Sequence, residues 1–192
     1  IFATTATTRG NLSNGVSYAT LIDGGTGDDQ FQVFRNMAVL DLEGGDGDDV
    51  FTVRSFANEG STWTNVKAGG GTGNKVSYVL NAPLTIDGGD GVDTLRIIGT
   101  EFNDQIVVTR DDIYGMGITV SYTNVERLEI DAAEGDDEIY VLSTKAGVET
   151  WLYGGLGNDR FSIAGDVPQV VSEETVIFPA TSGSHLTASI AG

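Results

Sequence analysis

The chain has 192 residues, of which 28 are Asp or Glu and 10 are Lys or Arg, and its net charge is −18. This charge argues against nucleic acid and anionic membranes as partners, because both are themselves negative. The 27 glycines are too few for a collagen repeat, and the lack of Cys excludes disulfides, thiol catalysis and Cys-bound zinc. No apolar run is long enough for membrane insertion, and residues 1–6 have neither an initiator Met nor a signal-peptide pattern. We therefore expect a piece of a longer protein.

A six-residue motif recurs along the chain: two small residues, any residue, glycine, a polar residue and aspartate. Four copies match it fully, and they begin at Gly24, Gly44, Gly88 and Gly154. Two further copies are degenerate. The copy at Gly70 has Lys75 in place of the aspartate, and the copy at Ala132 has lost its glycine pair.

Short runs of alternating apolar residues flank the copies, for example residues 40–42 before a copy and 51–53 after it. This period of two, with β-branched and aromatic residues, predicts strands, and no segment has a helical stripe. Successive copies begin 20, 26, 18, 44 and 22 residues apart, and 44 is two steps of 22. Turns of one chemistry at such a period are typical of stacked coils. We therefore predict an all-β, parallel β-helix or β-roll-like solenoid, with one Gly/Asp-rich loop per coil of 18–26 residues.

The pattern Gly-Gly-x-Gly-x-Asp-x-apolar-x in the four full copies resembles the RTX, or hemolysin-type, calcium-binding repeat of secreted bacterial proteins. The resemblance covers about residues 20–165. Family β-rolls usually carry loops on both sides of an 18-residue coil, whereas here only Asn103-Asp104 partly fits on the opposite side. Longer units, from Gly99 to Ile163, look like modules of very large bacterial surface proteins.

The resemblance implies Ca²⁺ as the cofactor. Ca²⁺ takes about 6–8 oxygen ligands, including backbone carbonyls, and glycine allows the positive φ that turns carbonyls inward. The leading side-chain ligands are then Asp29, Asp49, Asp93, Asp137 and Asp159. Secondary candidates are Asp28, Asp48, Asp136, Asn158 and Asp104. The loop glycines assigned to the sites are Gly24, Gly27, Gly44, Gly47, Gly88, Gly91, Gly154 and Gly157. The residues before the loops are either ligands or solvated neighbours: Asp23, Glu43, Asp87 and Asp131.

The degenerate Gly70 copy is an internal control, because it carries no aspartate. We expect no complete calcium site on either side of it, and we expect the Lys75 ammonium to take part of that space. The loops at Gly24 and Gly44, with Asp29 and Asp49 in phase, should form a better site.

Other interpretations remain open at this stage. Asp-Gly loops also form good turns without metal, and no EF-hand spacing is present. Trp63 and Trp151 suit stacking on a sugar or packing in a core. His185 stands alone, and adjacent carboxylates such as Asp111 and Asp112 point to opposite faces of a strand, so no catalytic group is assigned.

The function expected first is a calcium-binding, non-enzymatic structural segment of a large secreted or cell-surface bacterial protein. Its partners would be neighbouring modules of the same chain, with a polysaccharide or the cell surface as a further partner. The alternatives are a carbohydrate-binding or adhesive module and, less favoured, a polysaccharide-active β-helix enzyme. Residues 1–165 form the expected calcium-binding domain. Residues 166–192, where the glycine loops stop, form a cap or a linker to a following module.

Overall fold

The computed structural model describes residues 3–62 and 76–164, and these ranges form fifteen β-strands and no helix. The all-β class is therefore confirmed. Within the same ranges, nothing has the length and hydropathy of a membrane-crossing helix.

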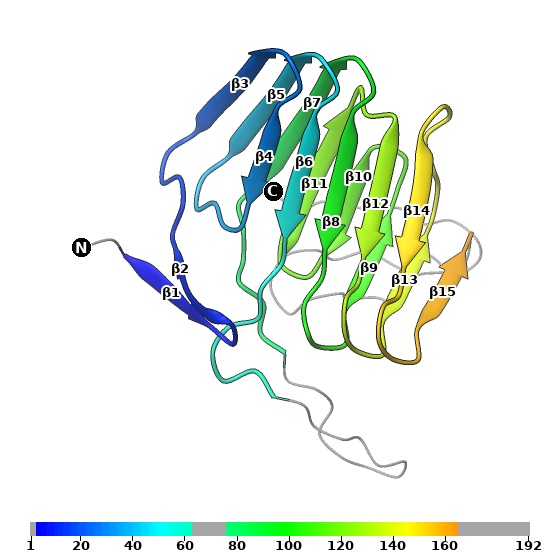
Figure 1. Ribbon diagram of the computed structural model, residues 1–192. Helices are drawn as coiled ribbons and strands as arrows, with labels where there is room; N and C mark the ends of the chain where they lie inside the picture. The colour runs from blue at the N-terminus through cyan, green and yellow to red at the C-terminus, as the bar shows by residue number, and fades with distance from the viewer. Residues whose placement is uncertain (1–2, 63–75, 165–192) are drawn as a thin grey trace, which may run out of the picture.

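The strands form two large sheets and one hairpin (Figure 1). The hairpin consists of β1 (Thr4–Thr7) and β2 (Gly10–Ser13). The eight-stranded sheet has the order β15 (Arg160–Ile163), β13 (Glu138–Val141), β9 (Gln105–Val108), β10 (Asp112–Gly115), β11 (Ile118–Thr123), β7 (Leu84–Asp90), β5 (Leu40–Asp46) and β3 (Thr20–Thr26). The five-stranded sheet has the order β14 (Glu149–Tyr153), β12 (Arg127–Asp131), β8 (Thr94–Ile98), β6 (Val50–Arg54) and β4 (Gln30–Val33), and all its pairs are parallel.

The two large sheets face each other and enclose a single hydrophobic core (Figure 1). Buried and more exposed side chains alternate along β5, β6, β7, β8, β11 and β12, as expected for a sheet with one solvent-exposed face. Phe51 of β6, Leu95 of β8, Leu42 of β5 and Ile86 of β7 belong to this core, and all four are at most 2% exposed.

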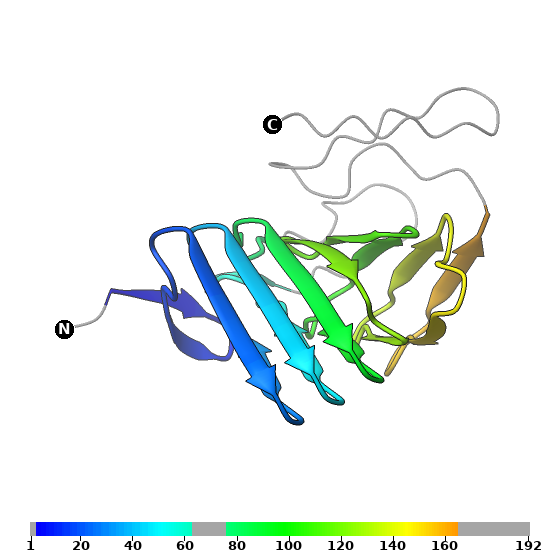
Figure 2. The same cartoon turned by 90° about the horizontal axis from the view of Figure 1, so that it is seen from above.

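Strands β3, β5 and β7 lie side by side, parallel and in register (Figure 2). Ile22 pairs with Leu42, and Leu42 pairs with Ile86. The step from β3 to β5 is 20 residues, and the step from β5 to β7 is 44. The three loops therefore stack in register although the two steps between them differ in length.

The prediction of a parallel β-helix or β-roll-like solenoid is wrong. Both large sheets are open, and the eight-stranded sheet is mixed, because β10 pairs antiparallel with both β9 and β11. The 44 residues between Gly88 and Ala132 are therefore not two coils of 22 residues. They contain a three-stranded meander that stays within one sheet.

The turn between β10 and β11 explains this departure. Met116 and Gly117 are its two central residues, with φ of 53° and 76°, and positive φ at both is the requirement of a type I′ hairpin turn. The tripeptide Gly-Met-Gly favours a hairpin turn. The hairpin keeps β10 and β11 in one sheet, where the repeat period predicted a crossing to the other sheet. Between Gly44 and Gly88, the described residues 55–62 and 76–83 belong to neither large sheet. The predicted cap or linker, 166–192, lies outside the described residues.

Close stacking constrains one loop glycine in particular. Gly45 has a φ of 104°, and a Cβ added to it would overlap the carbonyl of Gly25 in the neighbouring strand. Gly25 has nearly the same conformation, with a φ of 92°, but it lies on the edge strand and a Cβ there would meet nothing within 4 Å. A substitution at Gly25 therefore introduces backbone strain alone, whereas one at Gly45 introduces both backbone strain and a steric overlap.

We predict that Gly45→Ala destabilises the fold more than Gly25→Ala. Each substitution carries the left-handed backbone penalty of about 1–2 kcal/mol. Gly45→Ala adds an overlap that costs about 1–3 kcal/mol more. Denaturant unfolding of both variants measures the difference, and equal free energies of unfolding would contradict the stacking of these loops.

Candidate cation-binding loops

The Gly/Asp loops form two stacks, which lie at opposite ends of the strands of the two sheets (Figure 1). The first loop stack, residues 24–29, 44–49 and 88–93, carries the chain from the eight-stranded to the five-stranded sheet. The second loop stack, residues 99–104, 132–137 and 154–159, carries it back. The loops at Ala132 and Gly154 therefore do not share one column with those at Gly24, Gly44 and Gly88, as the single-sided repeat predicted. They lie in the second stack with Asn103-Asp104, which the sequence placed on the opposite side.

Aspartates at the sixth loop position form a hydrogen-bonded ladder in the first stack. The backbone N–H of Asp29 donates to Asp49 Oδ1 at 2.7 Å, and the N–H of Asp49 donates to Asp93 Oδ1 at 2.7 Å. The N–H of Asp93 continues the ladder to Glu126 Oε2 at 2.9 Å. Asp49 and Asp93 are fully buried.

The second stack repeats this ladder with different members. The N–H of Asp104 donates to Asp137 Oδ1 at 2.7 Å, and the N–H of Asp137 donates to Asp159 Oδ1 at 3.0 Å. Asp137 is fully buried and Asp104 is 1% exposed. The structure therefore brings Asp104, Asp137 and Asp159 together and separates them from Asp29, Asp49 and Asp93.

The fifth loop positions form an outer ladder that runs in the opposite direction. Asp28 Oδ1 accepts from the N–H of Asp48 at 2.9 Å, and Asp48 Oδ1 accepts from the N–H of Val92 at 2.9 Å. In the second stack, Asp136 Oδ1 accepts from the N–H of Asn158 at 2.8 Å. These side chains are exposed, and the secondary candidates Asp28, Asp48, Asp136 and Asn158 thus hold neighbouring loops together.

Four ladder aspartates have a buried carboxylate oxygen without a hydrogen-bond partner among the described residues. These are the Oδ2 atoms of Asp29, Asp49, Asp93 and Asp137. No ion pair among the described residues involves any of these four side chains. A buried carboxylate oxygen without a partner is costly, so these atoms require an explanation.

The first glycine of each loop makes room for this oxygen. A Cβ on Gly24 would lie 2.6 Å from Asp29 Oδ2 and 2.6 Å from the carbonyl oxygen of Gly44. At Gly88, the corresponding oxygens are Asp93 Oδ2 and the carbonyl of Asn124. Two acceptor oxygens therefore lie beside the same glycine. One is the carboxylate oxygen of its own loop, and the other is a backbone carbonyl oxygen of the neighbouring loop.

The structure corrects the expected neighbours of the degenerate Gly70 copy. Gly45 pairs with Gly89 and Asp46 with Asp90, so the loops at Gly44 and Gly88 are adjacent and no other loop separates them. The Gly70 copy and Lys75 lie outside the described residues. The in-phase stacking of Asp29 with Asp49 is confirmed by their hydrogen bond.

Sequence reasoning missed two members of the first stack. Glu126 occupies the rung that follows Asp93, and Asn124, with a φ of 48°, supplies the carbonyl beside Gly88. The available signal was the dipeptide Asn-Val ahead of Glu126, since Asn tolerates a left-handed backbone.

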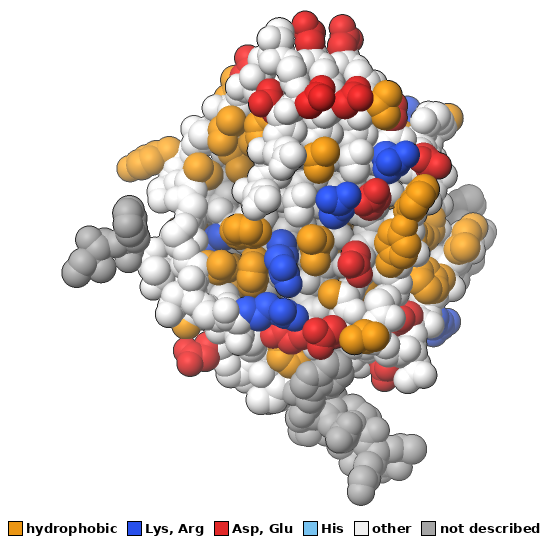
Figure 3. All heavy atoms as spheres, in the orientation of Figure 1, with side chains coloured by type: hydrophobic (Ala, Val, Ile, Leu, Met, Phe, Trp, Pro, Cys, Tyr) orange, Lys and Arg blue, Asp and Glu red, His pale blue; other side chains and the backbone are white. Residues whose placement is uncertain are grey.

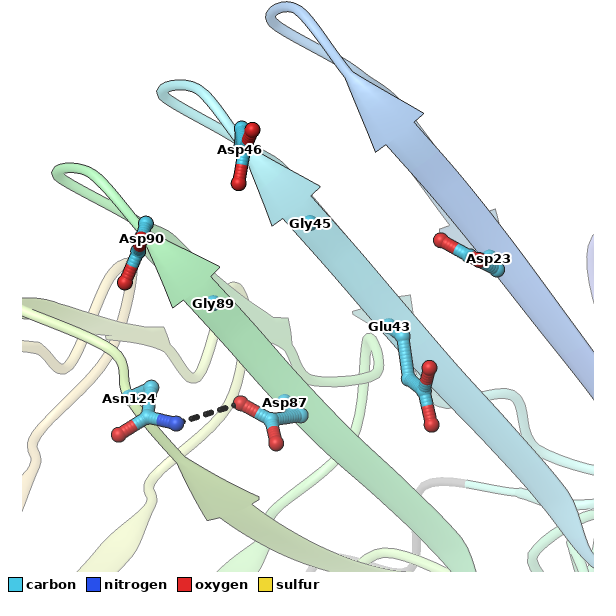
Figure 4. A pocket seen from close by; sticks show the side chains of 8 residues that line it. All are labelled: Asp23, Glu43, Gly45, Asp46, Asp87, Gly89, Asp90 and Asn124. Atoms are coloured by element: carbon cyan, nitrogen blue, oxygen red, sulfur yellow. Dashed lines mark hydrogen bonds between the residues drawn. The ribbon is translucent and has the colours of Figure 1, made fainter.

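Acidic side chains also cover the outer surface next to the first stack. Asp23, Glu43 and Asp87 form one row across β3, β5 and β7, and Asp46 and Asp90 of the first loop stack lie beyond this row (Figure 4). These residues line an open hollow of about 350 Å³, and the side-chain amide of Asn124 donates to Asp87 at 2.8 Å. Of the residues before the loops, Asp131 differs, because it accepts from the N–H of Ala133 in its own loop.

Charge is distributed unevenly over the molecule. Residues 20–29, 40–49 and 84–93 contain eleven carboxylates and no Lys or Arg. Acidic side chains gather at the edge formed by the first loop stack, whereas Lys and Arg side chains gather on the face of the five-stranded sheet (Figure 3). The loops are therefore a region of strong negative potential without an internal counter-charge.

Burial and neighbouring carboxylates shift the ionisation of the ladder. Burial raises the pKa of Asp137 to about 8, with further contributions from the negative charges of Asp104 and Asp159. Burial raises the pKa of Asp104 to about 6, although hydrogen bonds from Thr100 oppose the shift. The pKa of Asp93 is also raised by burial. These carboxylates therefore favour a proton, or another cation, in the folded state.

No group of three or more acidic or His side chains surrounds a common point in the described ranges. Any cation at the loops must consequently rely on backbone carbonyls and water beside one carboxylate per rung. Comparison with models of protein families, with curated proteins and with solved structures finds no match to the chain.

We predict that the chelator-treated protein becomes less stable as the pH rises from about 4 to about 8. The folded state binds the Asp137 proton more tightly than the unfolded chain does, so its stabilising effect is present at low pH and is lost as the pH rises through the folded pKa. Asp137→Asn should flatten this dependence, because Asn does not ionise. Asp90→Asn removes the same charge from the outer surface and is the control. Melting temperatures across this range test the prediction, and equal slopes for the two variants would contradict it.

Proposed function

We propose that the chain is a calcium-binding, non-enzymatic structural segment whose loops are stabilised by Ca²⁺. The observation that carries this proposal is the set of four buried aspartate oxygens without a partner, at Asp29, Asp49, Asp93 and Asp137. A turn that needed only glycine and a capping carboxylate would use Oδ1 alone. The orphaned Oδ2 atoms support a function for the second oxygen.

The donor set suits a hard cation. Each site offers a carboxylate oxygen and, in the first stack, the carbonyl oxygen of the next strand, and Ca²⁺ accepts both types of ligand. Glycine at the first loop position keeps this space free of a Cβ. Asp29, Asp49 and Asp93 would hold ions in the first stack, and Asp137 would hold one in the second.

Bound Ca²⁺ would stabilise the fold in two ways. It would supply the missing partner of each buried oxygen, and it would offset part of the repulsion among the carboxylates of the first stack. Because the ions bind only the stacked loops, binding would draw the chain towards the folded state. The chain's own contribution is to position the carboxylates by the amide ladder and to exclude water from them.

The setting that we propose is extracellular or at a bacterial cell surface, within a large protein and next to further modules of the same chain. The resemblance of the motif to RTX repeats supports this setting. Under this proposal the chain would remain loose in calcium-poor cytosol and would fold outside the cell.

Carbohydrate binding is a second candidate function. Trp151 and Tyr153 project from the outer face of β14, at 42% and 46% exposure, with ring centroids 6.4 Å apart. The guanidinium of Arg127 lies 5.4 Å from the Trp151 ring centre. Adjacent exposed aromatics with a charged neighbour suit stacking on a sugar ring.

We expect Ca²⁺ to raise the melting temperature and the β-sheet signal of the protein relative to the chelated state. The physical reason is the preferential binding of the cation to folded loops, which adds RT ln(1 + [L]/Kd) per site. Circular dichroism in EGTA, followed by millimolar Ca²⁺, measures both quantities. Identical melting curves in the two conditions would rule out calcium as the stabilising cation.

Asp49→Asn should weaken calcium binding by about tenfold or more, since it removes the charge of a central carboxylate. In chelator the same variant should be at least as stable as the wild type, because the buried charge is gone. Asp41→Asn is the matched control: it removes one charge from the same strand, outside the loop. Calorimetric titration of both variants tests the assignment, which fails if the two bind calcium equally well.

A further inference from the structure

One buried aspartate of the ladders has both of its oxygens satisfied. Asp104 Oδ2 accepts from the backbone N–H of Thr100 at 2.7 Å. Its Oδ1 accepts from the hydroxyl of Thr100 at 2.8 Å and from the hydroxyl of Tyr78 at 2.9 Å. At 1% exposure, Asp104 is as buried as the aspartates with an orphaned oxygen. The complete hydrogen bonding of Asp104 therefore results from the residues around it and not from a different exposure to solvent.

The neighbouring rung provides a direct comparison. Asp137 accepts from the N–H of Asp104 through Oδ1, while its Oδ2 has no partner among the described residues. The loop of Asp104 has Thr100 at the second position, where the full copies have glycine and the loop of Asp137 has Ala133. Neither glycine nor alanine brings a hydroxyl, so the extra side-chain donor is specific to the Asp104 loop.

Tyr78 reaches this loop from a distant part of the sequence. Its segment is held against residues 56–58, because the N–H of Val79 donates to the Phe56 carbonyl at 2.8 Å and the Asn58 amide donates to the Tyr78 carbonyl at 2.8 Å. Burial, together with the charge of Asp104, raises the pKa of Tyr78 above its ordinary value. The phenol therefore keeps its proton and remains a hydrogen-bond donor.

We propose that Thr100 and Tyr78 take the place of a cation at Asp104, so that this loop is closed by hydrogen bonds and does not bind Ca²⁺. Tyr78 and Thr100 are thus positioning residues for a calcium-independent rung. The proposal rests on the proposed function only in assigning cations to the other buried aspartates. It predicts that the second stack contains one rung that forms without calcium, next to one that requires it.

The first test compares Asp104→Asn with Asp137→Asn in EGTA at about pH 9. Asp104→Asn should lower the melting temperature, because an amide nitrogen cannot accept the hydrogen bonds that the carboxylate accepts. Asp137→Asn should raise it, since the substitution removes a buried charge without an acceptor role at Oδ2. Stabilisation by both substitutions would overturn the proposal. This comparison contains no calcium, so it is independent of whether the wild-type protein binds the ion.

The second test uses Tyr78→Phe, with Tyr140→Phe as the matched control. Tyr140 donates to Glu138 at 2.6 Å, so both variants lose one tyrosine–carboxylate hydrogen bond. In EGTA, Tyr78→Phe should shift the unfolding equilibrium about tenfold towards the unfolded state, the effect of losing a charge-assisted bond at a buried site. Tyr140→Phe should shift it less. Equal effects of the two variants would overturn the special role of Tyr78.

Calcium titration of the wild type separates the two proposals. If Ca²⁺ leaves its melting temperature unchanged, the proposed function fails while the EGTA comparisons still decide the role of Tyr78 and Thr100. If Ca²⁺ stabilises the wild type, Asp104→Asn should bind as many calcium ions as the wild type in a calorimetric titration. Loss of an ion in that variant would show that Asp104 is a ligand and would overturn the proposal.

Discussion

A carboxylate oxygen in one loop accepts a hydrogen bond from the backbone N–H of the matching residue in the next loop, and the rest of the structure depends on this rung. The interaction recurs at both ends of the strands. One end carries Asp29, Asp49 and Asp93, and the other carries Asp104, Asp137 and Asp159. Bonds to a charged acceptor are worth about 1.5–3 kcal/mol each. Because each rung buries a carboxylate, the same interaction that aligns the loops also creates the charge that must be compensated.

The loops and their register were predictable from the sequence because the motif fixes local backbone shape. Alternating apolar residues such as Phe51 and Val53 also identified strands that face the core. The distribution of loops over the two ends of the sheets was not predictable, since residues 99–104, ahead of the meander, already connect the five-stranded sheet back to the eight-stranded sheet. The solenoid prediction failed because the hairpin turn at Met116 and Gly117 makes the eight-stranded sheet mixed. Glu126 and Tyr78 were missed because long-range pairing, and not local spacing, brings them to the loops.

Compensation of the buried charges takes two forms in this fold. At Asp104, hydroxyl and amide donors from Thr100 and Tyr78 surround the carboxylate. At Asp29, Asp49, Asp93 and Asp137, one oxygen has no partner among the described residues. The proposed calcium sites are the loops in which the described residues supply no donor to the second carboxylate oxygen. Under the proposed function, the chain is a structural segment whose stability depends on external cation.

The most direct measurement is the anomalous difference density of crystals grown with Ca²⁺. The account predicts ions beside the orphaned oxygens of Asp29, Asp49, Asp93 and Asp137, together with carbonyl oxygens of the adjacent strand in the first stack, and no ion at Asp104. Well-ordered loops without anomalous density at any of the four aspartates would contradict it.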